Sequence, residues 1–334
     1  MDAFPPFIDV AMVVKGCFRF FYNLYNTAVG KCLHNCMIRN RHFRRIRSGQ
    51  HLDHSNIDRE FIDFPTLRIK IVPLAKTNYS YFMQDLPSGL LAVVDPGDPD
   101  YLAHIADTVF HQPISFAFVT HKHWDHSAGV TALKARYPAL RVIAHSKEKL
   151  AEATERLNDR DFVKLGTTTV TLLHTPGHTE GSVCYYVFQE EYQPILFTGD
   201  TLFLGGMGAF FEGSARAILS TIDKLKTLPD ETLIFPGHEY SEYTLRFARY
   251  IDSKNSSALT KGRWVFRSRN RYFCTIPMTM KEEKSYNPFL RLGTDAVQET
   301  TQTHTELAAL LGLMRLRITK RSEYKRTPLS TALP

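Results

Sequence analysis

The most informative part of this sequence is Val119-Thr-His121-Lys-His123-Trp-Asp125-His126-Ser-Ala-Gly129. It follows directly on a continuous apolar run, residues 114–119, which predicts a buried strand. A turn between a strand and a helix can direct imidazoles and a carboxylate into one pocket, whereas in mid-helix they would point in different directions. Such side chains bind Zn²⁺, iron or manganese. The stretch therefore predicts a metal site, and its density disfavours the alternative of a polar surface cluster.

Three later loops carry the same kinds of side chain. Each places a glycine directly before a histidine or an aspartate, where a tight turn can present the side chain. The loops are Thr175-Pro-Gly177-His178, Phe197-Thr-Gly199-Asp200 and Pro236-Gly237-His238, and each follows a predicted strand. Alone, each would be an ordinary loop. Together with the first stretch they predict one shared site.

Strand and helix patterns alternate along the body of the chain. The predicted strands are 67–72, 79–83, 90–94, 114–119, 141–144, 168–173, 183–187, 195–197 and 232–235, and the predicted helices are 101–109, 128–137, 215–225 and 241–250. Strands come in runs as well as in strand–helix units. We therefore expect an α/β fold in which two sheets are sandwiched between helices.

The four loops resemble the metal-binding motifs of the metallo-β-lactamase superfamily, and within it those of the glyoxalase II (hydroxyacylglutathione hydrolase) branch. The resemblance covers residues 67–291 and includes Gly199-Asp-Thr-Leu-Phe203, Phe211-Glu-Gly213, Gly237-His-Glu-Tyr240 and Tyr286-Asn-Pro-Phe289. It implies the αββα sandwich of that superfamily with a C-terminal helical extension. It also implies a metal-dependent hydrolase of thioesters related to S-2-hydroxyacylglutathione, acting through a hydroxide that bridges two metals.

All seven positions of the family's ligand set are filled by the expected residue. The resemblance gives one metal His121, His123 and His178 and the other Asp125, His126 and His238, with Asp200 bridging the two. Asp125 is also the expected catalytic residue, because a carboxylate beside the hydroxide can orient it or take up its proton. We expect two divalent cations, zinc first, with iron or manganese as alternatives.

Other residues are expected to surround the seven ligands, as hydrogen-bond partners or as substrate contacts. Thr120, Thr198 and Glu239 are the expected hydrogen-bond partners of the metal-binding histidines. Tyr240 is kept from the family pattern and is a predicted substrate contact, as is Arg321 at the position of a family lysine.

Two charged contacts to glutathione are replaced in this chain. A family lysine becomes Ala209 and a family arginine becomes Ile318. The predicted partner is therefore a small-molecule thioester, with a weakened recognition of glutathione conjugates.

Two other functions stay open. The same motif set resembles that of a mononuclear iron persulfide dioxygenase, which metal analysis and oxygen uptake would distinguish from a hydrolase. The third hypothesis is a membrane-attached scaffold with weak residual hydrolase activity. Metal binding without turnover of any thioester would favour that role.

The charge of the chain is concentrated in its first part. The 334 residues carry a net charge of +7, and residues 1–50 hold eight Lys or Arg against two Asp. Because the predicted catalytic body is close to neutral, the basic composition does not indicate a nucleic-acid partner. The composition, with 43% hydrophobic and 22% charged residues, is that of a soluble globular protein.

Residues 1–60 are interpreted as a basic leader and linker. Residues 7–30 are apolar and aromatic, but Asp9, Lys15 and Arg19 interrupt them, so no transmembrane helix is predicted. The basic run at 39–47 favours import into mitochondria or contact with an anionic membrane surface. The alternative is a leader that takes no part in the fold.

The remaining organisation follows from pattern. Five cysteines without a framework spacing favour a reducing, intracellular compartment. We expect a catalytic domain over residues 65–240 and a C-terminal helical extension over 241–325. Residues 299–317 have helical spacing, and the chain from about Tyr324 is expected to be frayed.

Overall fold

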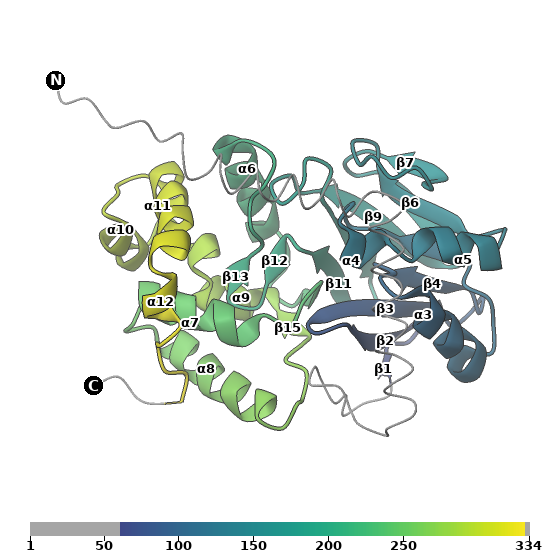
Figure 1. Ribbon diagram of the computed structural model, residues 1–334, viewed down its shortest axis with the longest axis horizontal. Coiled ribbons are helices and arrows are strands. Elements are labelled where there is room, and N and C mark those ends of the chain that lie inside the picture. Colours follow the sequence, from purple (N-terminus) through teal and green to yellow (C-terminus); the bar gives the residue numbers. More distant parts are fainter. Residues whose placement is uncertain (1–60, 331–334) are drawn as a thin grey trace.

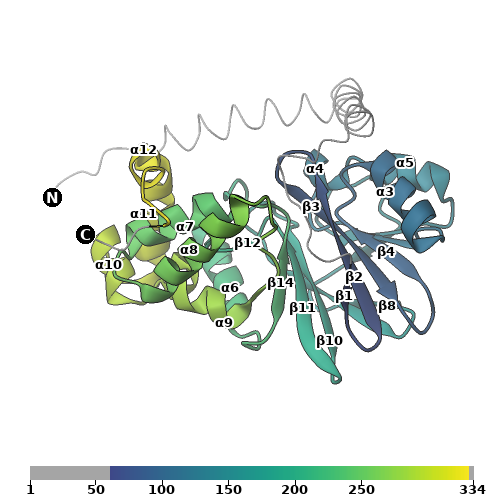
Figure 2. The same cartoon turned by 90° about the horizontal axis from the view of Figure 1, so that it is seen from below.

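The computed structural model describes residues 61–330, so the predicted leader, residues 1–60, lies outside the described part of the chain. Two β-sheets pack face to face, helices cover their outer faces, and a group of C-terminal helices lies beside them (Figures 1 and 2). This arrangement confirms the predicted αββα sandwich with a C-terminal extension. None of the helices within residues 61–330 is both long enough and apolar enough to cross a membrane.

The first sheet has seven strands in chain order. They are β1 (Ile62–Asp63), β2 (Leu67–Leu74), β3 (Asn78–Asp85), β4 (Leu91–Val94), β5 (Phe116–Phe118), β6 (Arg141–His145) and β7 (Glu155–Leu157). Neighbours are antiparallel as far as β4 and parallel from β4 to β7. Alternation along β5 turns Phe116 and Phe118 toward the second sheet and Ala117 toward the outer helices.

The outer face of the first sheet is covered by α3 (Pro99–Ile105), the π-helical turn Ala106–Phe110, α4 (Trp124–Ser127) and α5 (Val130–Arg136). Leu102 of α3 and Leu133 of α5 are fully buried against Phe82 and Val93 of the sheet. The sequence explains where α3 begins, because the Asp98 side chain accepts a hydrogen bond from the backbone N–H of Tyr101. These contacts form a core distinct from the one between the sheets.

The second sheet has six strands in the order β15-β14-β11-β10-β9-β8, of which only β11 and β14 are parallel neighbours. Its strands are β8 (Phe162–Leu165), β9 (Thr168–His174), β10 (Val183–Gln189), β11 (Tyr192–Gly199), β14 (Leu233–Pro236) and β15 (Met278–Thr279). Aromatic side chains join the two sheets: Phe118 packs on Tyr185 with ring centroids 5.0 Å apart, and Tyr81 on Phe197 at 5.2 Å. A separate hairpin consists of β12 (Leu202–Phe203) and β13 (Gly206–Met207).

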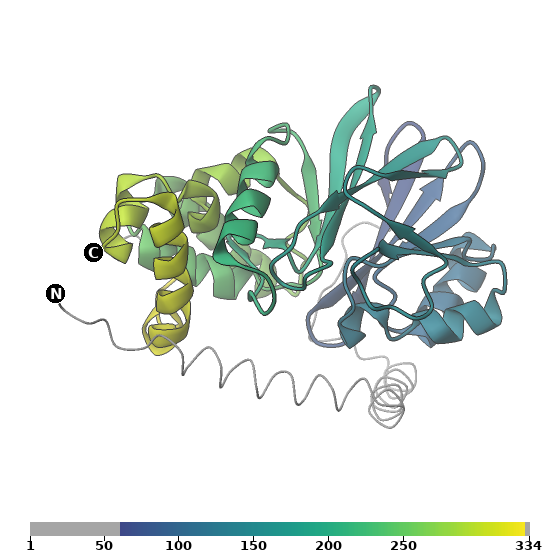
Figure 3. The ribbon, with the colours of Figure 1, turned by 90° about the horizontal axis from the view of Figure 1, so that it is seen from above.

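The remaining helices cover the second sheet and form the extension (Figures 1 and 3). They are α6 (Ala215–Lys226), α7 (Ser241–Ile251), α8 (Ser256–Arg269), α9 (Met280–Tyr286), the 3₁₀ turn Pro288–Arg291, α10 (Asp295–Thr301), α11 (Glu306–Thr319) and α12 (Arg321–Tyr324). The extension also contributes β15, which pairs with β14 at the edge of the second sheet. The sequence patterns do not predict that strand.

Two expectations about the extension are wrong. The helical spacing over residues 299–317 belongs to two helices, because Gln302 adopts a left-handed conformation (φ 56°) that ends α10, and the Thr305 side chain then caps α11. Tyr324 is not frayed. It is fully buried, with its ring packed on Tyr243 and Phe247 at 5.4 and 5.1 Å, so aromatic burial holds this part of the chain in place.

Candidate metal centre

The predicted ligands lie in the segments that follow strands, at one edge of the sandwich. His121 and His123 follow β5, Asp125 and His126 lie in α4, and His178, Asp200 and His238 follow β9, β11 and β14. The beginning of β3 meets the last of these loops, since the Tyr79 N–H donates to Gly237 O at 2.8 Å. Ligands from both sheets therefore converge where the sheets are joined.

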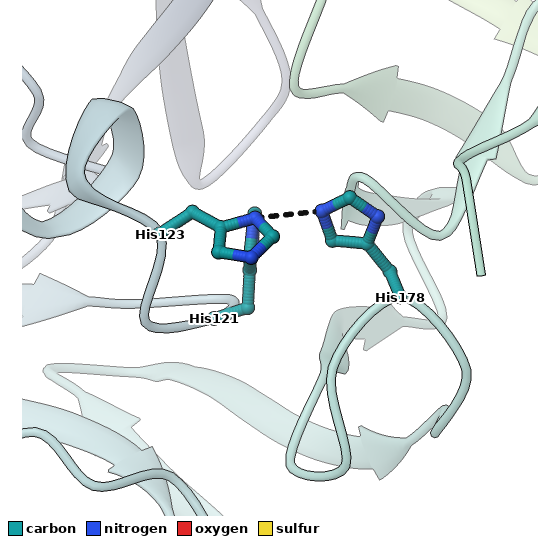
Figure 4. A group of neighbouring side chains, drawn as sticks. All are labelled: His121, His123 and His178. Atoms are coloured by element: carbon teal, nitrogen blue, oxygen red, sulfur yellow. Dashed lines mark hydrogen bonds between the residues drawn. The ribbon is translucent and has the colours of Figure 1, made fainter. Parts of the chain in front are cut away.

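The first cluster consists of His121, His123 and His178, all of them buried (Figure 4). Nδ1 of His123 lies 3.0 Å from Nε2 of His121 and 2.8 Å from Nε2 of His178. One nitrogen from each ring thus faces a common point. Three imidazole nitrogens arranged in this way are a typical site for a divalent metal ion.

The second cluster consists of Asp125, His126 and His238. Nε2 of His126 lies 3.2 Å from Nε2 of His238. Oδ2 of Asp125 lies 3.4 Å from Nε2 of His238 and 3.6 Å from Nε2 of His126. The two nitrogens and the carboxylate oxygen form a second potential ligand set beside the first.

Asp200 lies between the two clusters. Its Oδ2 is 3.4 Å from Nε2 of His178, and its Oδ1 is 3.3 Å from Nε2 of both His126 and His238. Oδ1 is buried and makes no hydrogen bond within residues 61–330. Burying a carboxylate oxygen without a hydrogen bond destabilises the folded state unless a nearby cation balances its charge. The donor set therefore fits divalent metal ions, with Asp200 placed to contact two.

The protonation of the first cluster suits metal binding. Burial and the neighbouring His178 lower the pKa of His123 to about 3, and burial together with the surrounding histidines lowers the pKa of His121 well below its usual value. Both rings are therefore neutral at pH 7, as metal ligation requires.

The second cluster behaves differently. Burial opposes protonation of His126, but Asp125, Asp200 and Asp95 outweigh it and raise its pKa to about 9. Without metal this cluster keeps a proton that a cation would replace.

Asp95 also contacts the centre, although the sequence patterns do not predict it. Its Oδ2 lies 2.8 Å from Nδ1 of His126, and its two oxygens accept hydrogen bonds from the backbone N–H and the hydroxyl of Thr120 at 2.8 and 2.7 Å. The carboxylate fixes the His126 ring so that Nε2 faces the centre. The available signal was a strand that ends in Asp-Pro-Gly, but the partner lies 31 residues further along the chain.

Three of the other ligands also have an outer hydrogen-bond partner. The Thr120 hydroxyl lies 3.1 Å from Nδ1 of His121, as predicted, and the Thr77 hydroxyl lies 3.2 Å from Nδ1 of His238. The Asn78 amide donates to Oδ2 of Asp125 at 2.9 Å. These contacts orient the ligands before a metal is bound.

The other two predicted partners are wrong. The Thr198 hydroxyl donates to Leu202 O, and Glu239 accepts from the Tyr79 hydroxyl and from Thr275. Both side chains bond to the surrounding framework instead of to a histidine: Thr198 donates to a backbone carbonyl, and Glu239 accepts from hydroxyl and backbone N–H donors.

The two predicted substrate contacts, Tyr240 and Arg321, lie in different surroundings. The ring of Tyr240 stacks on His238 with centroids 4.6 Å apart and planes 4° apart, so it lies beside the centre. Arg321 is exposed on α12, with its guanidinium 5.9 Å from the ring of Tyr243. Ile318, at the arginine position of the family, is also exposed.

The loop after β13 forms one wall of the centre. Ala209 O lies 2.7 Å from Nδ1 of His178, and the ring of Phe211 lies 5.1 Å from that of His178 and 5.9 Å from that of His123. Glu212 holds the loop in place by contacting Lys122 Nζ with both carboxylate oxygens at 2.8 Å. Phe211 belongs to the motif Phe211-Glu-Gly213, but the sequence does not predict that its ring contacts the site, where it makes this wall apolar.

Comparison with known proteins agrees with this arrangement. Residues 76–238 match the metallo-beta-lactamase superfamily, and residues 239–320 match the hydroxyacylglutathione hydrolase C-terminus. The crystal structure of ETHE1 from Myxococcus xanthus is similar in fold, with a TM-score of 0.55 at 22% identity over 78% of this chain and 95% of that one. A metallo-beta-lactamase from Staphylococcus aureus has a TM-score of 0.52 at 19% identity, over 81% of this chain and 75% of that one.

The sequence relatives are nearer. The chain is 38% identical over 237 residues to the cytoplasmic hydroxyacylglutathione hydrolase of Arabidopsis thaliana, covering 70% of this chain and 91% of the relative. It is 34% identical over 241 residues to the hydroxyacylglutathione hydrolase-like protein of Gallus gallus, covering 70% and 84%. Members of this superfamily bind divalent metals through a His/Asp centre of the kind described above. The chain therefore belongs to the metallo-β-lactamase superfamily and, within it, to the hydroxyacylglutathione hydrolase family.

Proposed function

We propose that this protein is a metal-dependent hydrolase of thioesters related to S-2-hydroxyacylglutathione. The observation that carries the proposal is the complete set of seven ligand side chains in two adjacent clusters, with Asp200 between them. The identity to hydroxyacylglutathione hydrolases over most of their length supports the substrate class. Zinc is the proposed metal because imidazole and carboxylate ligands suit it, and iron and manganese are the alternatives.

The chemistry that bound divalent cations supply here is Lewis acidity toward the acyl oxygen and a lowered pKa for water. The residues of the chain would hold those cations through nitrogen atoms of five histidines and the carboxylates of Asp125 and Asp200. A thiolate is a good leaving group, so the reaction needs no dedicated general acid. The chain therefore has to orient water and substrate more than it has to donate protons.

Asp125 is the proposed catalytic carboxylate. Burial opposes its ionisation, but His126 and His238 outweigh it and hold the pKa of Asp125 well below its usual value. The hydrogen bond from Asn78 fixes Oδ2, so the group is an oriented, ionised acceptor at neutral pH. We assign it the role of holding the attacking water and receiving its proton.

Tyr240 is the proposed substrate donor. Burial raises the pKa of its hydroxyl well above the usual value, so the side chain stays a neutral O–H donor at pH 7. Its stacking on His238 places it next to the second cluster. Arg321, on the exposed face of α12, is a second proposed contact for the anionic part of a larger substrate.

The test uses the full chain. Metal content is measured, and thiol release is then followed with S-D-lactoylglutathione and with simple acetyl thioesters, before and after chelation. We expect two zinc per chain, turnover of the glutathione thioester, and loss of turnover on chelation. One iron per chain with oxygen uptake on glutathione persulfide would instead identify a dioxygenase, and bound metal without turnover of any thioester would favour the scaffold.

We further propose that residues 1–60 direct the chain to mitochondria or to an anionic membrane surface. The support is the concentration of positive charge in residues 1–50. A fusion of residues 1–60 to a fluorescent protein should be located on mitochondria or membranes, and replacing the arginines between residues 39 and 47 by glutamine should release it. A fusion that stays diffuse in both forms would contradict the proposal.

A further inference from the structure

Arg317 lies where the C-terminal helices meet the metal centre. It belongs to α11, and its Nη1 donates to the carbonyl oxygens of Met207 and Gly208 at 2.6 and 3.0 Å. These carbonyls belong to the segment that leaves β13 and becomes the wall of the centre. One guanidinium nitrogen therefore holds two successive peptide units of that segment.

The next peptide unit contacts a metal ligand. Ala209 O lies 2.7 Å from Nδ1 of His178. A carbonyl can only accept, so Nδ1 carries the hydrogen and Nε2 is left free to face the first cluster. The contacts run from Arg317 through Met207 and Gly208 to Ala209, and from there to His178.

The segment has little room to move independently of the ligands. The Gly208 N–H donates to Thr201 O at 3.3 Å. A Cβ atom on Gly208 would lie 1.9 Å from Asp200 O and 3.2 Å from Nδ1 of His178. The backbone of Gly208 is thus packed against the peptide carbonyl of Asp200 and against the imidazole ring of His178, so His178 is the ligand whose side chain it contacts.

Arg317 is itself held by the extension. The Tyr324 hydroxyl donates to Arg317 O at 3.0 Å, and that hydroxyl also contacts the hydroxyl of Tyr243. Within residues 61–330 no carboxylate forms an ion pair with Arg317, so no acidic group competes with the two carbonyls for its guanidinium. The side chain has the contacts of a residue that positions the Met207–Ala209 backbone.

We propose that Arg317 is a positioning residue for the metal-binding histidine His178. Through the backbone of residues 207–209 it fixes the orientation of the His178 ring, and so links the C-terminal helices to the first metal cluster. The inference rests on the metal centre of the proposed function and not on its substrate. It predicts unequal effects on the two clusters, because the second has its own outer partners in Asn78, Asp95 and Thr77.

The test measures the two zinc affinities separately. The full-length wild type, R317M, R317K and the control R315M are stripped of metal and titrated with zinc against a chelator of known affinity. Arg315 lies on the same helix with an exposed side chain, so R315M removes the same charge without touching the segment. For R317M we expect one zinc constant to weaken by about 10- to 100-fold, the range for loss of an outer-shell partner, while the other stays unchanged.

R317K should lie between R317M and the wild type, because a lysine can donate to one of the two carbonyls. It also serves as the decisive variant if circular dichroism shows that R317M does not fold. Cobalt titration gives a second readout, since the absorption of bound Co²⁺ should change for one site in R317M and R317K and for neither site in R315M.

Two outcomes would overturn the proposal. One is that R317M or R317K loses the same zinc affinity at both sites, or loses none at either site. The other is a raised KM for a thioester with unchanged zinc constants, which would make Arg317 a substrate contact. The proposed function fails independently of these outcomes, if the wild type binds two zinc ions and hydrolyses no thioester.

Discussion

Asp200 presents one carboxylate oxygen to each metal cluster. Oδ1 lies 3.3 Å from nitrogens of the second cluster and Oδ2 lies 3.4 Å from His178 of the first. Asp200→Ala should therefore weaken the binding of both metals. The loss of affinity should exceed the roughly 10- to 100-fold that is typical when an outer-shell residue is removed. Metal analysis after dialysis should give well below one zinc per chain. The control Asp107→Ala removes an exposed carboxylate and should keep both metals. Full metal content in Asp200→Ala would contradict the assignment of Asp200 as a ligand.

Ala209 stands where the family resemblance expects a lysine. The residue is partly exposed, and its own carbonyl oxygen already contacts His178, so a longer side chain can extend from the wall without disturbing that contact. Ala209→Lys should lower the KM for S-D-lactoylglutathione by about 3- to 10-fold, the value of one charge-assisted contact at a partly hydrated site. Ala209→Met controls for size. An unchanged KM, or an equal effect of both variants, would show that this position does not face the glutathione part.

Asp85, at the end of β3, joins the first sheet to the β8–β9 hairpin of the second. Its Oδ1 accepts hydrogen bonds from the hydroxyls of Thr167 and Thr168 and from the Thr168 N–H, at 2.7 to 3.0 Å, and its Oδ2 accepts from Ser88. Burial opposes ionisation, but these donors lower the pKa of Asp85 from 3.8 to about 2. The ionised form is therefore bound more favourably in the folded chain than in the unfolded one.

A lowered folded-state pKa gives stability that is present above the unfolded pKa and is lost as the pH falls through the folded one. Asp85→Asn should lower the free energy of unfolding by about 2 kcal/mol at pH 7, and the difference should shrink between pH 4 and pH 2. Urea unfolding at several pH values measures it. Asp63→Asn, at an exposed ion pair with Arg68, should change little, and a pH-independent difference for Asp85→Asn would contradict the assignment.

The elements show what the sequence could and could not predict. The seven ligands could be found because each follows a strand with its own local signal, a buried apolar run or a glycine before the ligand. Asp95 could not, because its contact with His126 arises only when β4 and β5 pair. The break at Gln302 and the burial of Tyr324 depend in the same way on packing between distant segments, which periodicity does not record.

At the scale of the whole molecule, the metal centre joins the two sheets. His121, His123 and the residues of α4 belong to the first sheet's side, whereas His178, Asp200 and His238 follow strands of the second. Bound metal therefore opposes separation of the sheets. Chelation removes the stabilisation of the folded state that two bound metal ions confer when free metal is in excess. That stabilisation is about 2.7 kcal/mol for each site when the free metal is at 100 times its Kd.

Chelation should thus lower the Tm of the full chain by about 10 °C or more, given roughly 2–4 °C per kcal/mol for a domain of this size. Differential scanning calorimetry with and without chelator measures the shift, and added zinc should restore it. Because Asp200 faces both sites, Asp200→Ala should have a Tm that chelator hardly changes, whereas Asp107→Ala should respond like the wild type. A wild-type Tm that is insensitive to complete metal removal would mean that the sheets are held together without the centre, by the aromatic contacts and hydrogen bonds between them.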